Sequence, residues 1–151
     1  MLHITEISKK ECRAADTLTL AFDMRQKSRL LTLLDSGEEA ALMLPPGTTL
    51  RGGDFLCATD GRVIEVKAQA ERVITGYTQD YLTWARACYH LGNRHVPLQL
   101  GVGWLRFAYD HVLVRMISNM GLRVVDECAP FEPEAGAYAQ HAARPVFTNP
   151  C

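Results

Sequence analysis

The feature that most constrains the fold is a change in hydrophobic period near residue 70. Before this point, short apolar runs are separated by turn signals such as Asp35-Ser36-Gly37, Pro45-Pro46-Gly47 and Asp60-Gly61. Short apolar runs separated by such turn residues predict β-strands that form a small barrel or sandwich. The predicted strands cover residues 17–25, 30–34, 39–44, 55–59 and 62–68.

After residue 70 the apolar residues recur at helical spacing in two places. One predicted helix begins near Thr78, as its cap, and ends at Gly92; the second begins at Asp110 and ends at Gly121. The strands predicted around them cover residues 72–77, 96–102, 104–109 and 122–128. The resulting order β-α-β-β-α-β is that of a ferredoxin-like unit, in which both helices cover one face of an antiparallel sheet.

The sequence therefore predicts an α+β protein with three parts. A small, β-rich domain is expected over residues 1–70, and a ferredoxin-like βαββαβ domain over residues 71–134. A flexible C-terminal tail is expected over residues 135–151, where Pro145 and Pro150 oppose regular structure.

Charge and composition exclude several classes of protein. The 16 basic and 17 acidic residues give a net charge of −1, so no basic surface for nucleic acid is predicted. No apolar run approaches the roughly 20 residues of a membrane span, and the N-terminal residues lack a signal-peptide pattern. The 5 cysteines include no C-x-x-C pair, which is typical of reduced thiols in a cytoplasmic protein.

The histidines indicate where a metal could bind. They are His3, His90, His95, His111 and His141, and none of them forms an H-E-x-x-H or H-x-x-x-H pair. A two-fold dimer repeats each ligand across its axis, so one exposed histidine near that axis would supply two imidazoles to one ion. Imidazole suits Ni²⁺, Cu²⁺ and Zn²⁺, and the residues alone leave the choice between them open.

Five segments, taken in order, resemble the urease accessory protein E family. They are Arg25-Gln26-Lys27-Ser28-Arg29, Leu44-Pro45-Pro46-Gly47, Tyr89-His90-Leu91-Gly92-Asn93-Arg94-His95, Asp110-His111-Val112-Leu113 and Pro130-Phe131-Glu132-Pro133-Glu134-Ala135-Gly136-Ala137-Tyr138. No single segment is decisive, but five in register are specific, and together they span nearly the whole chain up to the last of them.

The resemblance implies a homodimer joined through its ferredoxin-like domains, and it implies that the β-rich domain over residues 1–70 binds partner proteins. It implies that His95 and its dimer mate bind Ni(II), with further ligands from C-terminal histidines, so the expected metal ligands are His95, His141 and His111. Zn(II) or Cu(II) could occupy the same site. The protein would catalyse nothing and would pass Ni(II) to the urease apoprotein complex and its accessory GTPase.

Two departures from the family pattern bear on the expected site. Many members carry a histidine-rich tail, whereas this chain has only His141 beyond Tyr138, which predicts a capacity of about one ion per dimer. Some members have a histidine just before D-H-V-L, where this chain has Tyr109. His111 therefore lacks the neighbour that a secondary metal site would use.

Two alternative functions follow from the same residues. The β-rich domain carries no catalytic pattern and could bind peptides or client proteins without metal. A hydrolase could use Cys88 as nucleophile and His90 as base, although residues two apart on a helix point in different directions.

Overall fold

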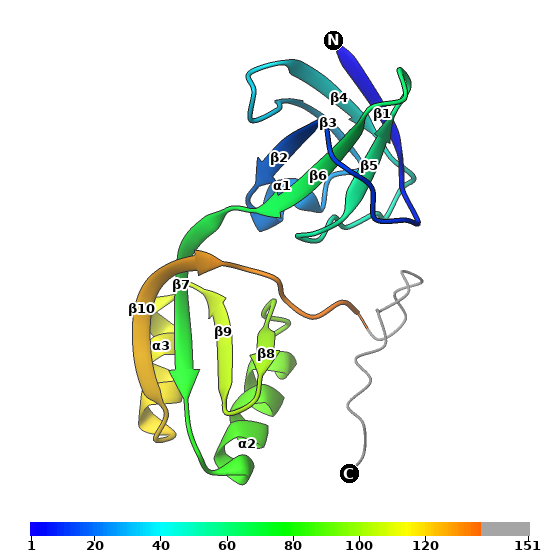
Figure 1. Cartoon of the computed structure of the whole chain (residues 1–151). Helices are drawn as coiled ribbons and strands as arrows, with labels where there is room; N and C mark the ends of the chain where they lie inside the picture. Colours follow the sequence, from blue (N-terminus) through cyan, green and yellow to red (C-terminus); the bar gives the residue numbers. More distant parts are fainter. Residues whose placement is uncertain (137–151) are drawn as a thin grey trace.

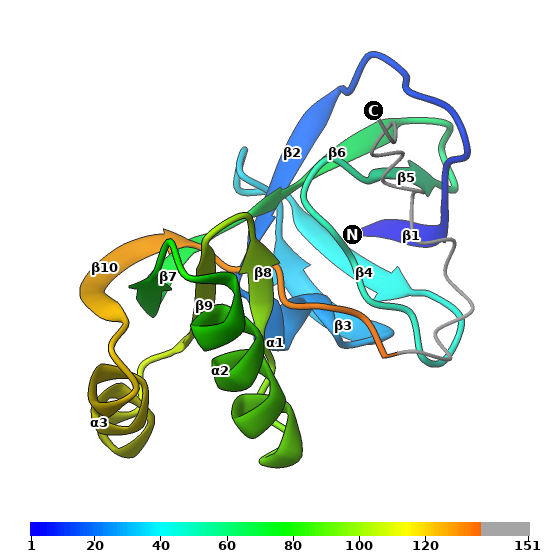
Figure 2. The same cartoon turned by 90° about the horizontal axis from the view of Figure 1, so that it is seen from below.

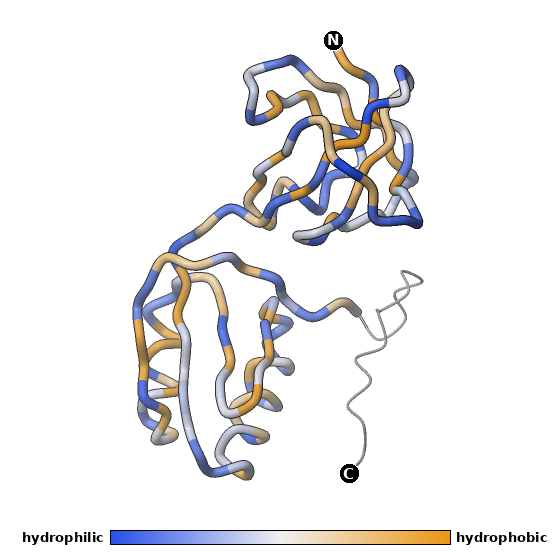
Figure 3. Tube along the Cα trace, in the orientation of Figure 1, coloured by the Kyte–Doolittle hydropathy of each residue, from blue (hydrophilic) through white to orange (hydrophobic). Residues whose placement is uncertain are grey.

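The computed structural model describes residues 1–136, and the predictions that concern the tail beyond them, including His141, lie outside the described residues. The chain forms two units, each built on its own sheet (Figure 1). We call residues 2–68 the N-terminal unit and residues 70–130 the C-terminal unit. Hydrophobic positions recur along the strands of both units, and hydrophilic positions gather at the turns (Figure 3).

The N-terminal unit is a six-stranded sheet with strand order β2-β6-β5-β1-β4-β3. Its elements are β1 (Leu2–Ile7), β2 (Asp16–Leu20), α1 (Phe22–Arg25), β3 (Arg29–Leu33), β4 (Glu39–Met43), β5 (Phe55–Ala58) and β6 (Val63–Ala68). Strand β1 pairs in parallel with β4, and β2 pairs in parallel with β6. The mostly-strand character that the turn signals predicted is confirmed.

Two local predictions for this unit were wrong. Strand β1 was not among the predicted strands, although Ile4 is fully buried in the core beside Leu18 and Leu56. The predicted strand over residues 17–25 ends at Leu20, and the chain then turns into the one-turn helix α1. The helix places Arg25 in the interior, where its guanidinium meets acceptors that an extended strand would not reach.

Asp35 connects the two edge strands of this sheet. Its backbone N–H donates to the Thr17 carbonyl at 2.9 Å, and its carboxylate accepts hydrogen bonds from the Thr17 and Thr19 hydroxyls. Because Thr17 lies on β2 and Asp35 follows β3, the sheet curls until its edges approach, as in a partly open barrel.

The C-terminal unit is a four-stranded antiparallel sheet with strand order β10-β7-β9-β8. Its elements are β7 (Ala70–Tyr77), α2 (Tyr81–Asn93), β8 (Gln99–Gly101), β9 (Trp104–Ala108), α3 (His111–Asn119) and β10 (Arg123–Pro130). Both helices lie on one face of the sheet (Figure 2). The ferredoxin-like βαββαβ prediction is confirmed. No helix within residues 1–136 is long and apolar enough to cross a membrane.

The two helices begin on aspartate caps. The Asp80 carboxylate accepts a hydrogen bond from the Thr83 backbone N–H, so Asp80 is the cap of α2, and the prediction of Thr78 was wrong. Asp110 caps α3 as predicted, because its carboxylate accepts from the N–H groups of Val112 and Leu113.

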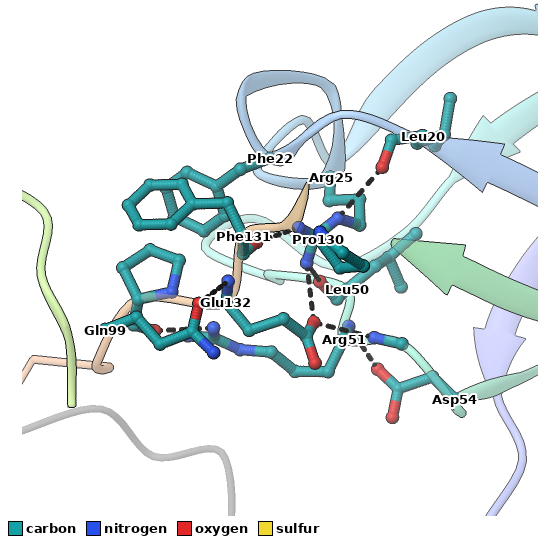
Figure 4. A network of polar contacts seen from close by, with 12 residues as sticks. Leu20, Phe22, Arg25, Leu50, Arg51, Asp54, Gln99, Pro130, Phe131 and Glu132 are labelled. Atoms are coloured by element: carbon teal, nitrogen blue, oxygen red, sulfur yellow. Dashed lines mark hydrogen bonds and ion pairs between the residues drawn. The ribbon is translucent and has the colours of Figure 1, made fainter. Parts of the chain in front are cut away.

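A buried arginine joins the segment after β10 to the N-terminal unit (Figure 4). The Arg25 guanidinium donates to the carbonyls of Leu20 and Leu50, each at 3.1 Å, and to the carbonyl of Phe131. It also donates to the Glu132 carboxylate at 2.8 Å. Burial lowers the pKa of Arg25, and the charge of Glu132 opposes that shift.

The same segment also contacts the C-terminal unit. The Glu132 backbone N–H donates to the Gln99 side chain at 3.0 Å, and the Glu134 N–H donates to the Leu98 carbonyl at 2.8 Å. The Glu132 carboxylate meanwhile accepts from the Gly52 N–H at 2.8 Å. Residues 131–134, which we call the strap, therefore bind both units and fasten them to each other.

Replacing the buried arginine tests how much the strap contributes to stability. Arg25→Met is expected to lower the free energy of unfolding by about 3–5 kcal/mol, because it leaves buried carbonyls without their donor and Glu132 without its opposite charge. Urea unfolding followed by circular dichroism measures the change. Arg62→Met is the matched control. Arg62 pairs with two carboxylates at the surface, so its replacement should lower the free energy of unfolding by less than about 1 kcal/mol. Equal losses in both variants would contradict the prediction.

Candidate metal site

His95 lies in the loop that follows α2 and is exposed to solvent. Its backbone has φ of 56°, and it is the one residue other than glycine with positive φ among residues 1–136. This left-handed conformation is unfavourable for residues with a Cβ atom. The site predicted from sequence therefore coincides with the most unusual backbone position in the described chain.

Two hydrogen bonds at the end of α2 produce this conformation. The His95 N–H donates to the Gly92 carbonyl at 3.0 Å, and the Val96 N–H donates to the Leu91 carbonyl at 3.3 Å. This pair is the Schellman motif, whose left-handed residue is here His95. Leu91 and Val96 both pack in the core of the C-terminal unit. Since the helix continues through Gly92 to Asn93, the prediction that Gly92 ends it was wrong.

The end of a helix favours positive charge near it. The last carbonyl groups of α2 point towards its C-terminal end, where the helix dipole has its negative pole. A cation bound by the His95 imidazole would lie close to this pole. The local electrostatics therefore agree with a metal-binding role.

His111 occupies the first turn of α3 and is also exposed. The pairing of Gln99 with Arg106 places the start of β8 and the end of β9 at the same end of the sheet. The loop before β8, with His95, and the first turn after β9, with His111, therefore lie at that same end. Within the described residues, however, no three His, Cys, Asp or Glu side chains gather closely enough to hold a metal ion.

Tyr109 precedes the cap of α3 and has a structural role. The Arg72 guanidinium lies 3.7 Å from the centre of the Tyr109 ring and forms an ion pair with Asp126 at 2.8 Å. Tyr109 thus connects the start of β7 to the beginning of α3.

The strap brings the chain back beside the His95 loop. Leu98, whose carbonyl accepts from the Glu134 N–H, lies only three residues after His95. His141, seven positions after Glu134, lies outside the described residues.

The outer face of α2 carries exposed apolar side chains, with the exposed Arg86 between them. Leu82 and Tyr89 are 52% and 66% exposed, and they lie two helical turns apart on the face turned away from the sheet. Trp84, Ala87 and Leu91 face inward, with the Trp84 indole N–H bonded to the Trp104 carbonyl. The face of α2 that leads to His95 is thus free to contact another molecule.

Cys88 and His90 do not form a catalytic pair. Cys88 packs against the core, and burial raises the pKa of its thiol, which keeps it in the unreactive protonated form. His90 is exposed, with its ring packed edge-on against Tyr89 at 5.4 Å between centres. The geometry offers no support for the hydrolase alternative.

Comparison with known proteins covers both units. The profile of the UreE urease accessory protein N-terminal domain matches residues 2–69, and that of the UreE C-terminal domain matches residues 62–146. A urease accessory protein UreE from Alkalilimnicola ehrlichii is 54% identical over 138 residues, covering 91% of this chain and 85% of that protein.

Relatives from other bacteria are longer than the matched part. UreE proteins from Burkholderia thailandensis and Paraburkholderia xenovorans are 53% and 52% identical, covering 82% and 83% of this chain. The matches span only 58% and 56% of those two proteins. Since profiles for both domains match in order, and the identity extends over most of the chain, this chain belongs to the UreE family of urease accessory proteins.

Proposed function

We propose that this chain is a nickel-binding metallochaperone that delivers Ni(II) for assembly of the urease active site. UreE proteins are urease accessory chaperones with a role in urease maturation, and they are not enzymes, which confirms the expectation of a non-catalytic protein. The observation that carries the nickel proposal is the exposed imidazole of His95, held in a left-handed conformation just beyond the C-terminal end of α2.

A homodimer through the outer face of α2 would complete the site. A two-fold axis beside α2 would bring the exposed Leu82 and Tyr89 of two copies together and place the two His95 residues on opposite sides of one ion. Two imidazoles leave coordination positions for other groups and for exchange. Such a site binds nickel and can also release it, which is what a carrier requires.

We propose different roles for His141 and His111. The strap starts the C-terminal segment beside the His95 loop, so His141 could supply a third ligand to the same ion. His111 shares one end of the sheet with His95 but comes from the other helix, so we propose it only for a secondary site. Zn(II) and Cu(II) also accept imidazole and would compete with nickel at the main site.

The proposed partners are other urease maturation factors in the cytoplasm, namely the accessory GTPase and the urease apoprotein complex. The support for a docking role in the N-terminal unit is a cluster of exposed apolar side chains. Leu31, Leu33 and Met43, on the paired strands β3 and β4, are 71%, 58% and 47% exposed. We propose that an apolar segment of one of these maturation proteins packs against this cluster, beside the edge strand β3.

The central ligand is tested by isothermal titration of nickel. His95→Ala is expected to weaken nickel binding at least about tenfold, because each dimer would lose two imidazole ligands at once. His90→Ala is the matched control, since His90 is an exposed histidine five residues earlier, in the last turn of α2. Unchanged affinity in His95→Ala, or equal loss in both variants, would rule out the proposed site.

A pair of leucine variants separates dimerisation from partner binding. Leu82→Glu on α2 should shift metal-free protein from dimer to monomer in sedimentation analysis, because it would bury two charges in the proposed interface. Leu31→Glu, at a comparably exposed leucine on β3, should leave the dimer intact. A dimer that survives Leu82→Glu would place the interface elsewhere.

The same pair tests the second candidate function, metal-independent client binding. Its support is the Leu31, Leu33 and Met43 cluster, which contains no metal ligand. If that function is correct, tagged protein with a chelator present should still capture the urease apoprotein, and Leu31→Glu should abolish capture. Capture that needs nickel and is insensitive to Leu31→Glu would remove this candidate.

A further inference from the structure

The two helices of the C-terminal unit end in the same motif on different residues. At the end of α3 the Gly121 N–H donates to the Ser118 carbonyl at 3.0 Å, and the Leu122 N–H donates to the Ile117 carbonyl at 3.1 Å. These are the same two bonds that end α2. The left-handed residue of α3 is Gly121, with φ of 96°, whereas that of α2 is His95.

Glycine is the usual residue at this position because it has no Cβ atom to collide with the neighbouring carbonyl. Gly121 follows that rule: a Cβ added there would meet no other atom within 4 Å, so its requirement comes from the backbone conformation alone. The other residues of positive φ within residues 1–136 are all glycines. His95 is the exception, in a fold that otherwise places glycine wherever this conformation is needed.

The fold itself gives no reason for the exception. His95 is exposed, and within residues 1–136 its imidazole makes no hydrogen bond or ion pair. The apolar residues that complete the motif, Leu91 and Val96, would pack equally well around a glycine. A strained backbone conformation that adds nothing to the stability of the fold is typical of residues that bind a ligand.

We infer that the left-handed cap of α2 is the positioning element of the nickel site, and that the protein loses stability by having a residue with a Cβ atom at this position in place of glycine. The inference rests on the proposed function. It adds that the histidine must stand at this backbone position, beyond the last turn of α2, and that another histidine in the same loop would not replace it. The site is therefore a place where stability and metal binding oppose each other.

Thermal unfolding in the presence of a chelator tests the loss of stability without any metal. His95→Gly is expected to raise the midpoint by about 3–6 °C, because glycine removes the strain. His95→Ala, which removes the imidazole but keeps a Cβ atom, should leave the midpoint within about 2 °C of the parent. The difference between the unfolding midpoints of these two variants separates the effect of backbone strain from the effect of the imidazole.

The reciprocal change at the equivalent position of α3 supplies the matched control. Gly121→Ala should lower the midpoint by about the amount that His95→Gly raises it, since the same motif then gains a Cβ atom. Asparagine tolerates the left-handed region better than alanine, so Gly121→Asn should lower the midpoint less. A midpoint for His95→Gly that equals or falls below that of His95→Ala would overturn the inference.

Nickel titration of a shifted histidine tests positioning. The double variant Arg94→His/His95→Gly keeps one histidine in the loop and removes the strain, and it should still bind nickel at least about tenfold more weakly than the parent. Affinity restored to the parent level would overturn the positioning role. If His95→Ala binds nickel normally, the proposed function fails instead, whatever the unfolding midpoints are, so the two failures are distinguishable.

Discussion

The Arg25 guanidinium is the interaction on which the arrangement of the two units depends. It is fully buried, and a buried charge is tolerable only when its donors are satisfied. Its partners come from three separate places in the chain: Leu20, Leu50 and the strap. Satisfying this one side chain therefore fixes the strap against the N-terminal unit. Phe131 adds apolar contact, because its ring packs edge-on against Phe22.

The strap then carries this constraint to the candidate metal site. It hydrogen-bonds Leu98 and Gln99, the residues that lead from the His95 loop into β8. Two of the segments that carry the family resemblance, around Arg25 and Glu132, thus meet in space. The family pattern therefore marks a junction between the two units as well as candidate ligands.

The candidate metal site offers few ligands in a single copy of the chain. In the proposed homodimer each copy would offer an exposed imidazole at the end of a helix, with no preformed cage of three ligands among residues 1–136. A structural zinc site is closed by four ligands and does not release its ion readily. A carrier needs the opposite, and symmetry can supply enough ligands to bind while leaving positions open for transfer. The left-handed backbone at His95 belongs to the same balance between binding and stability.

Sequence alone determined the change from strands to helices near residue 70 and the βαββαβ order, because periodicity and caps are local signals, and its motif residues singled out His95 as the candidate ligand. It failed at α1 and at the end of α2. There the outcome depends on partners far along the chain: Arg25 turns inward to reach Phe131 and Glu132, and α2 passes Gly92 because Leu91 and Val96 close the core. Tertiary packing alone decided that the strained position falls on a histidine, since only the folded core shows which residue must follow the last turn.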